Sequence, residues 1–178
     1  FASLYARQVR GERVFRDMLR QFNRWAIAES DEGPVHLGYR LGHIRGQPRV
    51  FRAVVYNKGA AVLHMLRRLV GDETFFVALR RFYAEQKFKK ADTEALRRTF
   101  EAASGRPLGR FFDQWIYGAD LPRVRFSRTI EAGSVSVRFE QTTEQLFDIP
   151  VTVTITYVNG RTQEEVVIIT ERPTDWTS

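Results

Sequence analysis

The chain has 178 residues, of which 43% are hydrophobic and 13% aromatic, so a packed core is expected and a disordered chain is excluded. It contains no cysteine, which excludes disulfides and thiolate metal sites and leaves the redox compartment open. The net charge of +7 is uneven, because basic residues dominate up to Arg123 whereas eight acidic residues face five arginines after Val124. Two regions of opposite charge indicate two structural units.

The first fifty residues predict helices followed by a loop. Apolar residues recur at helical spacing from Leu4 to Ala26, which predicts one or two amphipathic helices with a break at Gly11. Asp-Glu-Gly-Pro at 31–34 predicts a turn, and residues 35–50 show no clear period and predict a loop. No apolar run approaches the roughly 20 residues of a membrane span, so none is expected.

Three further helices are predicted after this loop. The first covers 51–69 and stops at Gly71, Asp72 caps the second, and Asp92 or Thr93 caps the third. The apolar residues expected to face inward are Val55, Val62, Leu63, Leu66, Leu69, Phe75, Phe76, Leu79, Phe82, Tyr83, Leu96 and Phe100.

A short aromatic segment closes the helical part. Gly105 is expected to end the third helix, and Phe111, Phe112 and Trp115 then fall on one side of the segment 108–115. They could form an exposed binding patch, but their helical spacing favours core packing.

Beyond Pro122 the apolar residues alternate with polar ones, which is typical of strands. Strands are predicted at 123–130, 134–141, 148–158 and 163–170, and Asn159-Gly160 predicts a hairpin. The residues expected on the inward faces are Val124, Phe126, Val135, Val137, Phe139, Val151, Val153, Ile155, Tyr157, Val166 and Ile168.

These patterns predict an α+β fold, with an α-helical domain at 1–121 followed by an antiparallel β-sandwich-like domain at 122–178. Four strands are few for a sandwich. An exposed strand edge is therefore expected, with self-association through that edge as a consequence; the oligomeric state itself stays open.

One string in the first predicted domain carries a chemical hypothesis. Taken alone, Tyr56 beside Gly59 and Ala60 is typical of a half-buried packing residue. However, Tyr56-Asn57-Lys58-Gly59-Ala60 resembles the Tyr-x-Lys-Gly-Ala string of the M1 (gluzincin) zinc aminopeptidases. The strings at 71–75 and 104–115 are similar to the continuation of that family, and Phe1 to Ala6 resembles the string that follows the third zinc ligand. Together they cover roughly 1–6 and 50–122.

The resemblance implies a thermolysin-like catalytic domain whose helical C-terminal subdomain is the first domain here. It implies a His2Glu zinc site formed by an HExxH helix and a later Glu, with the Glu inside HExxH as general base. It also implies that the Tyr56 phenol donates a hydrogen bond to the oxyanion formed from the substrate's peptide carbonyl. Loss of one such donor typically costs ~10²–10³ in rate.

This chain departs from the family pattern because it contains neither HExxH nor the Gly-x-Met-Glu-Asn string. We interpret it as a C-terminal fragment that lacks the zinc ligands, and we expect it to be inactive alone and to bind no zinc. Its histidines are His36, His43 and His64; none follows the HExxH spacing, and two histidines in one loop without a third ligand make a poor metal site.

Two other classes of function stay open. A non-catalytic M1-like scaffold for protein interaction would also lack zinc ligands. The paired arginines at 67–68, 80–81 and 97–98, with Lys87, Lys89 and Lys90, could bind nucleic acid. Because the aromatic residues are expected on apolar faces and not between these basic residues, we expect a peptide substrate and no nucleic acid.

Overall fold

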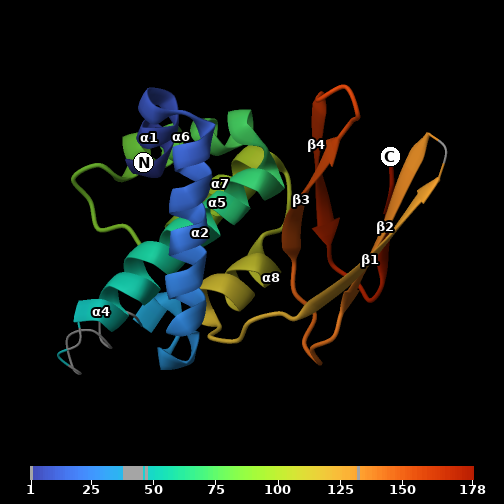
Figure 1. Ribbon diagram of the computed structural model, residues 1–178. Coiled ribbons are helices and arrows are strands. Elements are labelled where there is room, and N and C mark those ends of the chain that lie inside the picture. Colours follow the sequence, from blue (N-terminus) through green and yellow to red (C-terminus); the bar gives the residue numbers. More distant parts are fainter. Residues whose placement is uncertain (1, 38–45, 47, 132) are drawn as a thin grey trace. The chain divides into compact units, whose positions relative to one another are not determined.

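The computed structural model describes residues 2–37, 46, 48–131 and 133–178. Two helices come first, α1 (Ala2–Arg10) and α2 (Glu12–Ala28), and they contact each other (Figure 1). The predicted break at Gly11 is confirmed. Gly11 has φ 86°, a conformation that glycine adopts without steric cost, so the chain can change direction between the two helices.

Short helical turns precede the segment that carries Tyr56. The 3₁₀ turns η1 (Ser30–Glu32) and η2 (Val35–Leu37) occupy the predicted turn and the start of the predicted loop; most of that loop lies outside the described residues. Helix α4 (Pro48–Phe51) continues directly into η3 (Arg52–Lys58), and η3 continues into α5 (Gly59–Val70). The predicted helix at 51–69 is therefore present, but it begins at Pro48.

The segment η3 is a π-helix, which sequence periodicity did not predict. Its backbone makes i→i+5 hydrogen bonds, so each turn is wider than a turn of the flanking α-helices. A 3.6-residue period averaged over the whole helix hides such a short segment. Single π-helical turns are rare and frequently occur at functional sites.

Helices α6 (Asp72–Gln86), α7 (Thr93–Ser104) and α8 (Gly109–Phe112) follow, with a second π-helical turn, η4 (Asp113–Tyr117). Asp92 caps α7 by accepting a hydrogen bond from the Ala95 N–H at 2.7 Å, as predicted. Asp72 does not cap α6, since Gly71 occupies that position; the Asp72 carboxylate instead pairs with buried Arg67.

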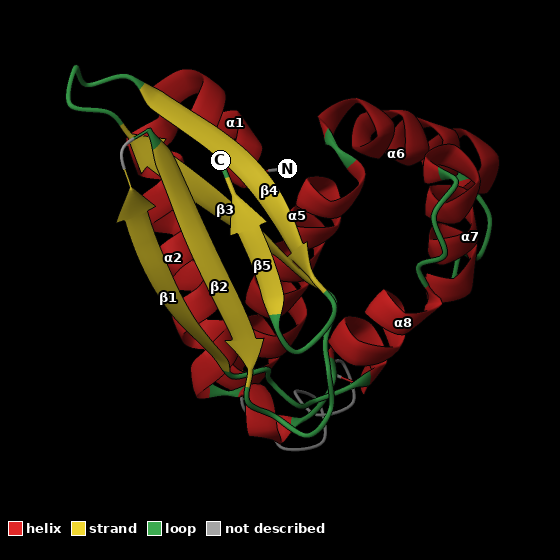
Figure 2. Cartoon of the chain, turned by 90° about the vertical axis from the view of Figure 1, so that its right-hand side faces the viewer, coloured by secondary structure: helices red, strands yellow, loops and turns green. Residues whose placement is uncertain are grey.

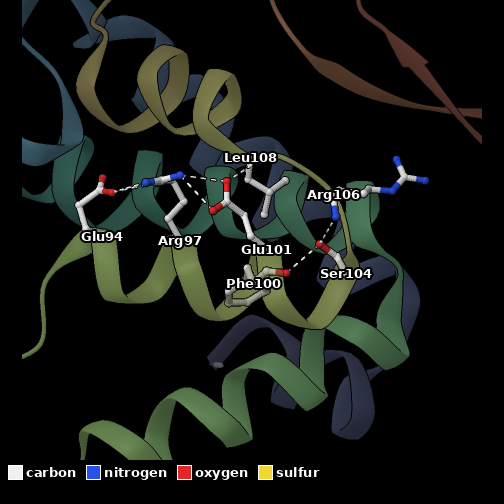
Figure 3. A network of polar contacts seen from close by, with 7 residues as sticks. All are labelled: Glu94, Arg97, Phe100, Glu101, Ser104, Arg106 and Leu108. Carbon is white, nitrogen blue, oxygen red and sulfur yellow. Dashed lines mark hydrogen bonds and ion pairs between the residues drawn. The ribbon is translucent and has the colours of Figure 1, made fainter.

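A polar network fixes the turn from α7 into α8 (Figure 3). Arg97 lies between two carboxylates and donates to Glu94 at 2.6 Å and to Glu101 at 2.9 Å. Glu101 Oε1 also accepts the backbone N–H of Leu108 at 2.8 Å. This carboxylate therefore satisfies a donor of a residue that is itself buried.

Aromatic side chains form the core of these helices. Phe75 contacts Phe100, which is completely buried, at 5.4 Å between ring centroids. Phe111, Phe112 and Trp115 are all buried, so the prediction that they pack in the core is confirmed.

The C-terminal part forms two antiparallel sheets, and the α+β fold class is confirmed. Strand β2 (Ser134–Gln141) lies between β1 (Val124–Glu131) and β5 (Thr174–Thr177), as Figure 2 shows. Strands β3 (Ile149–Thr156) and β4 (Thr162–Ile169) form a separate hairpin around Asn159-Gly160, as predicted. The short β5 was not predicted.

The two sheets share one hydrophobic core, which corrects the predicted phase of β4. Val167 and Ile169 are buried against Val137 and Phe139 of β2, whereas Val166 is 36% exposed. Val166 and Ile168 had been expected to face inward. The run 166–169 is apolar on both faces of the strand, so alternation could not decide which face is buried.

By its internal contacts the chain divides into two compact units: Phe1–His64 with Phe112–Leu121, and Met65–Phe111 with Pro122–Ser178. In the second unit, the Arg68 side chain donates to Thr152 of β3 at 3.2 Å, and Arg110 donates to the Leu146 and Thr170 carbonyls at 3.1 Å. Helices and sheets are thus joined by hydrogen bonds there. Domains at 1–121 and 122–178 remain a prediction, because contact density does not measure independent folding.

Candidate functional site

Tyr56, the predicted catalytic residue, projects from the π-helical segment η3 into solvent. Its side chain is 64% exposed, whereas Val54, Asn57 and Lys58 of the same segment are buried. The Phe51 ring contacts the Tyr56 ring edge-on, with centroids 5.6 Å apart and planes at 75°. The phenol is therefore held on one side by an aromatic neighbour and remains accessible to a ligand.

Tyr56 lines a cavity of about 1010 Å³ within the first unit. The walls come from α1, α2, α4, η3 and α5, so residues near position 2 and residues near position 60 line the same cavity. Besides Tyr56, the described lining residues include the aromatic residues Phe22, Trp25 and Phe51, the arginines Arg49 and Arg52, and the polar Asn57. The cavity size is in the range of sites that bind small molecules or short peptides.

Two polar side chains lie buried next to Tyr56 in sequence. Lys58 is only 3% exposed, and its Nζ has no hydrogen-bond partner among the described residues; the same holds for Asn57 Nδ2. Burial lowers the pKa of Lys58, and the charge of Asp120 opposes this shift. Sequence reasoning did not identify this buried lysine, because a lysine on a helix is ordinarily exposed.

The described histidines do not form a metal site. The His64 ring contacts Phe15 at 5.6 Å, and the His36 ring contacts Tyr117 at 4.9 Å, so each packs against an aromatic side chain. His43 lies outside the described residues. Within the described parts of the chain, no group of three or more His, Cys, Asp or Glu side chains could hold a metal ion. These residues therefore do not fit a zinc site by themselves.

The basic turn after α6 differs from the sequence expectation. Phe88 lies between Lys87 and Lys89, is completely exposed and has φ 63°, so one aromatic residue does lie among the basic residues. Tyr83, predicted to face inward, is also exposed. The absence of nucleic-acid binding remains a prediction.

No helix in the described ranges has the length and apolar character needed to cross a membrane.

A comparison with protein-family models matches residues 4–115 to the peptidase family M1 domain. The chain belongs to peptidase family M1. The match covers more than half of the chain and includes α2, the π-helical segment with Tyr56, and all helices up to η4. The resemblance predicted from the sequence strings is confirmed at this level.

Similar proteins found by sequence comparison include aminopeptidases, which agrees with this family. The chain is 33% identical over 72 residues to aminopeptidase N of Lactococcus lactis, which covers 40% of this chain and 8% of that protein. It is 32% identical over 84 residues to aminopeptidase M1 of Arabidopsis thaliana, which covers 47% of this chain and 10% of that protein. The chain thus spans about a tenth of the length of the curated relatives it matches.

Among solved structures, the crystal structure of Legionella pneumophila aminopeptidase A in complex with aspartic acid is similar. The TM-score is 0.62 at 15% identity, and the match covers 72% of this chain and 16% of that chain. At this identity the likeness supports the fold alone. This chain thus shares its fold with part of a much longer protein.

Proposed function

We propose that this chain is part of a zinc-dependent aminopeptidase and contributes Tyr56 to its active site. The whole protein hydrolyses N-terminal residues from peptides, and the zinc ligands come from a segment outside this sequence. The single observation that carries the proposal is the position of Tyr56, exposed at a cavity while its neighbours in η3 are buried. Membership of family M1 supplies the reaction class.

The proposed role of Tyr56 follows from where charge develops in peptide hydrolysis. When water adds to the peptide carbonyl, the oxygen becomes anionic, and a fixed O–H donor stabilises this state more than the neutral carbonyl. The contact with Phe51 restricts the ring, so the donor is oriented before the substrate arrives. The π-helical turn supports this role by presenting Tyr56 outward between buried neighbours.

The test replaces Tyr56 by Phe in the full-length protein and measures hydrolysis of aminoacyl-anilides with zinc present. We expect kcat to fall by ~10²–10³ with KM nearly unchanged, because the lost hydrogen bond forms mainly in the transition state. Tyr83→Phe is the matched control, since Tyr83 is an exposed tyrosine on α6 that does not line the cavity. Full kcat in Tyr56→Phe would remove the role assigned to Tyr56.

A second candidate is a non-catalytic M1-like scaffold for protein interaction, favoured by the lack of a metal-binding group among the described residues. The residues that precede Phe1 in the full-length protein discriminate the two. An HExxH string followed by a Glu just before Phe1 supports the peptidase, and substituted ligands support the scaffold. In either case the 178-residue chain alone is expected to bind no stoichiometric zinc and to be inactive, which metal analysis and an anilide assay check.

A further inference from the structure

The described lining residues of the Tyr56 cavity carry charge of one sign. The charged side chains among its described lining residues are Arg49 and Arg52, and no acidic side chain lines it there. The remaining lining is aromatic, small or neutral. A ligand that brings a negative charge into this cavity would therefore meet two cations and no carboxylate from these residues.

The two arginines differ in how far their charge is already neutralised. Arg49 forms an ion pair with Glu29, with 2.9 Å between Nη2 and Oε1; the Glu29 side chain is mostly buried, whereas that of Arg49 is 81% exposed. Arg52 is exposed and makes no ion pair or side-chain hydrogen bond with any residue in the described ranges. Arg52 thus carries a positive charge that this part of the chain does not balance.

Arg52 also lies close to the proposed catalytic phenol. It precedes Tyr56 by four residues in η3, and both side chains line the same cavity. An extended peptide advances about 3.3–3.6 Å per residue. A group bound by Arg52 would therefore lie in the same cavity as the carbonyl that contacts Tyr56, a short stretch of extended peptide away.

We propose that Arg52 binds a carboxylate of the peptide substrate and so sets a preference for substrates that carry one near the scissile bond. The inference rests on the proposed function. The guanidinium group presents a planar pair of N–H donors that matches a carboxylate, and charge-assisted hydrogen bonds of this kind are the strong ones. Two sources share this chemistry: the side chain of an acidic residue and the C-terminal carboxylate of a short peptide.

The experiment measures kcat/KM of the zinc-loaded full-length protein on matched peptides. Comparing Ala-Ala with Ala-Ala-amide tests recognition of the terminal carboxylate. Comparing Ala-Glu-amide with Ala-Gln-amide tests an acidic side chain at the second residue. Comparing Glu-Ala-amide with Gln-Ala-amide tests an acidic side chain at the first residue. In the wild type we expect one of these pairs to favour the carboxylate by about 10- to 100-fold, the range of a hydrogen bond to a charged group.

The variants locate the preference. Arg52→Gln should reduce it to near 1, and Arg52→Glu should favour the neutral member of the same pair. Arg49→Gln is the matched control, because Arg49 already pairs with Glu29, and it should change the preference by less than about threefold. The inference would be overturned if the wild type showed no preference for the carboxylate peptide, or if Arg52→Gln left the preference unchanged. Tyr56-dependent cleavage of neutral peptides would still support the proposed function in that case.

If no peptide is cleaved, a binding measurement distinguishes failure of the carboxylate site from failure of the proposed peptidase function. Titration calorimetry of Ala-Ala and Ala-Ala-amide, and of Ala-Glu-amide and Ala-Gln-amide, is then compared between the full-length wild type and Arg52→Gln. Tighter binding of one carboxylate peptide that disappears in Arg52→Gln would keep the carboxylate site although the peptidase proposal fails. Equal binding of all four peptides would remove the site.

Discussion

Replacing Glu101 by Ala should destabilise the chain more than replacing Glu94 by Ala, although both carboxylates bind Arg97. The two substitutions each remove one partner of Arg97. Glu101 has a second function, because its Oε1 accepts the backbone N–H of Leu108 at the start of α8. The comparison between the two variants tests whether this hydrogen bond adds to stability.

The expected magnitude follows from the burial of Leu108. The whole residue is 1% exposed, so a water molecule cannot easily replace the acceptor that its backbone N–H loses. A buried N–H left without a partner costs about 1–3 kcal/mol, and we expect Glu101→Ala to lose about this much. Glu94→Ala removes a partly exposed ion pair with Arg97 and leaves the Leu108 hydrogen bond in place, so it should cost less. Glu101→Gln, which keeps an acceptor for Leu108, should fall between them.

Urea unfolding of the 178-residue chain, followed by circular dichroism, measures the free energy of unfolding of each variant. Equal losses in Glu101→Ala and Glu94→Ala would refute the reasoning, since the Leu108 hydrogen bond would then contribute nothing. A loss in Glu101→Gln as large as that in Glu101→Ala would show that the carboxylate charge matters and the hydrogen bond does not.

Two further predictions concern buried side chains. Lys58→Met should raise the free energy of unfolding near pH 7 by about 1–4 kcal/mol, because it removes a buried ammonium group that has no hydrogen-bond partner among the described residues. Burial lowers the pKa of Lys58 in the folded wild type below 10.5, its value in the unfolded chain. Between the lowered pKa and pH 10.5, the folded wild type therefore binds fewer protons than the unfolded chain. Wild-type stability therefore rises with pH there, and the advantage of Lys58→Met should shrink toward pH 10.5; a constant difference would contradict the assignment. In β4, Ile169→Ala should cost about 2–5 kcal/mol and Ile168→Ala less, because Ile169 is the fully buried one, and the reverse order in urea unfolding would contradict the assigned strand phase.

The helices and hairpin were predictable because short-range chemistry determines them. Asp92 as a cap and Asn159-Gly160 as a turn depend on neighbours in sequence, and both are confirmed. The phase of β4 was wrong because residues 166–169 are apolar on both faces, and only packing against β2 selects Val167 and Ile169. Strand β5 (Thr174–Thr177) was missed because it is short and polar, and it is stabilised by pairing with β2.

The candidate site was predictable only in part. Tyr56 was identified through a family string, and periodicity alone would have made it a half-buried packing residue. The π-helical segment, in which Tyr56 is exposed and Lys58 is buried, could not be predicted, because a short stretch of wider turns leaves no clear mark on a helical pattern. The cavity, and the different surroundings of Arg49 and Arg52, depend on helices that are distant in sequence.

The central claim is that the phenol of Tyr56 stabilises an anionic oxygen in the transition state, and inhibitor binding tests it most directly. The inhibition constants of a phosphinic peptide, which carries a tetrahedral anionic centre, and of a substrate-like peptide are compared in full-length wild type and Tyr56→Phe. The account predicts that the phosphinic peptide binds about 10²–10³-fold more weakly to the variant, in step with the loss of kcat/KM, while the substrate-like peptide binds equally well. Equal weakening for both peptides, or for neither, would contradict it.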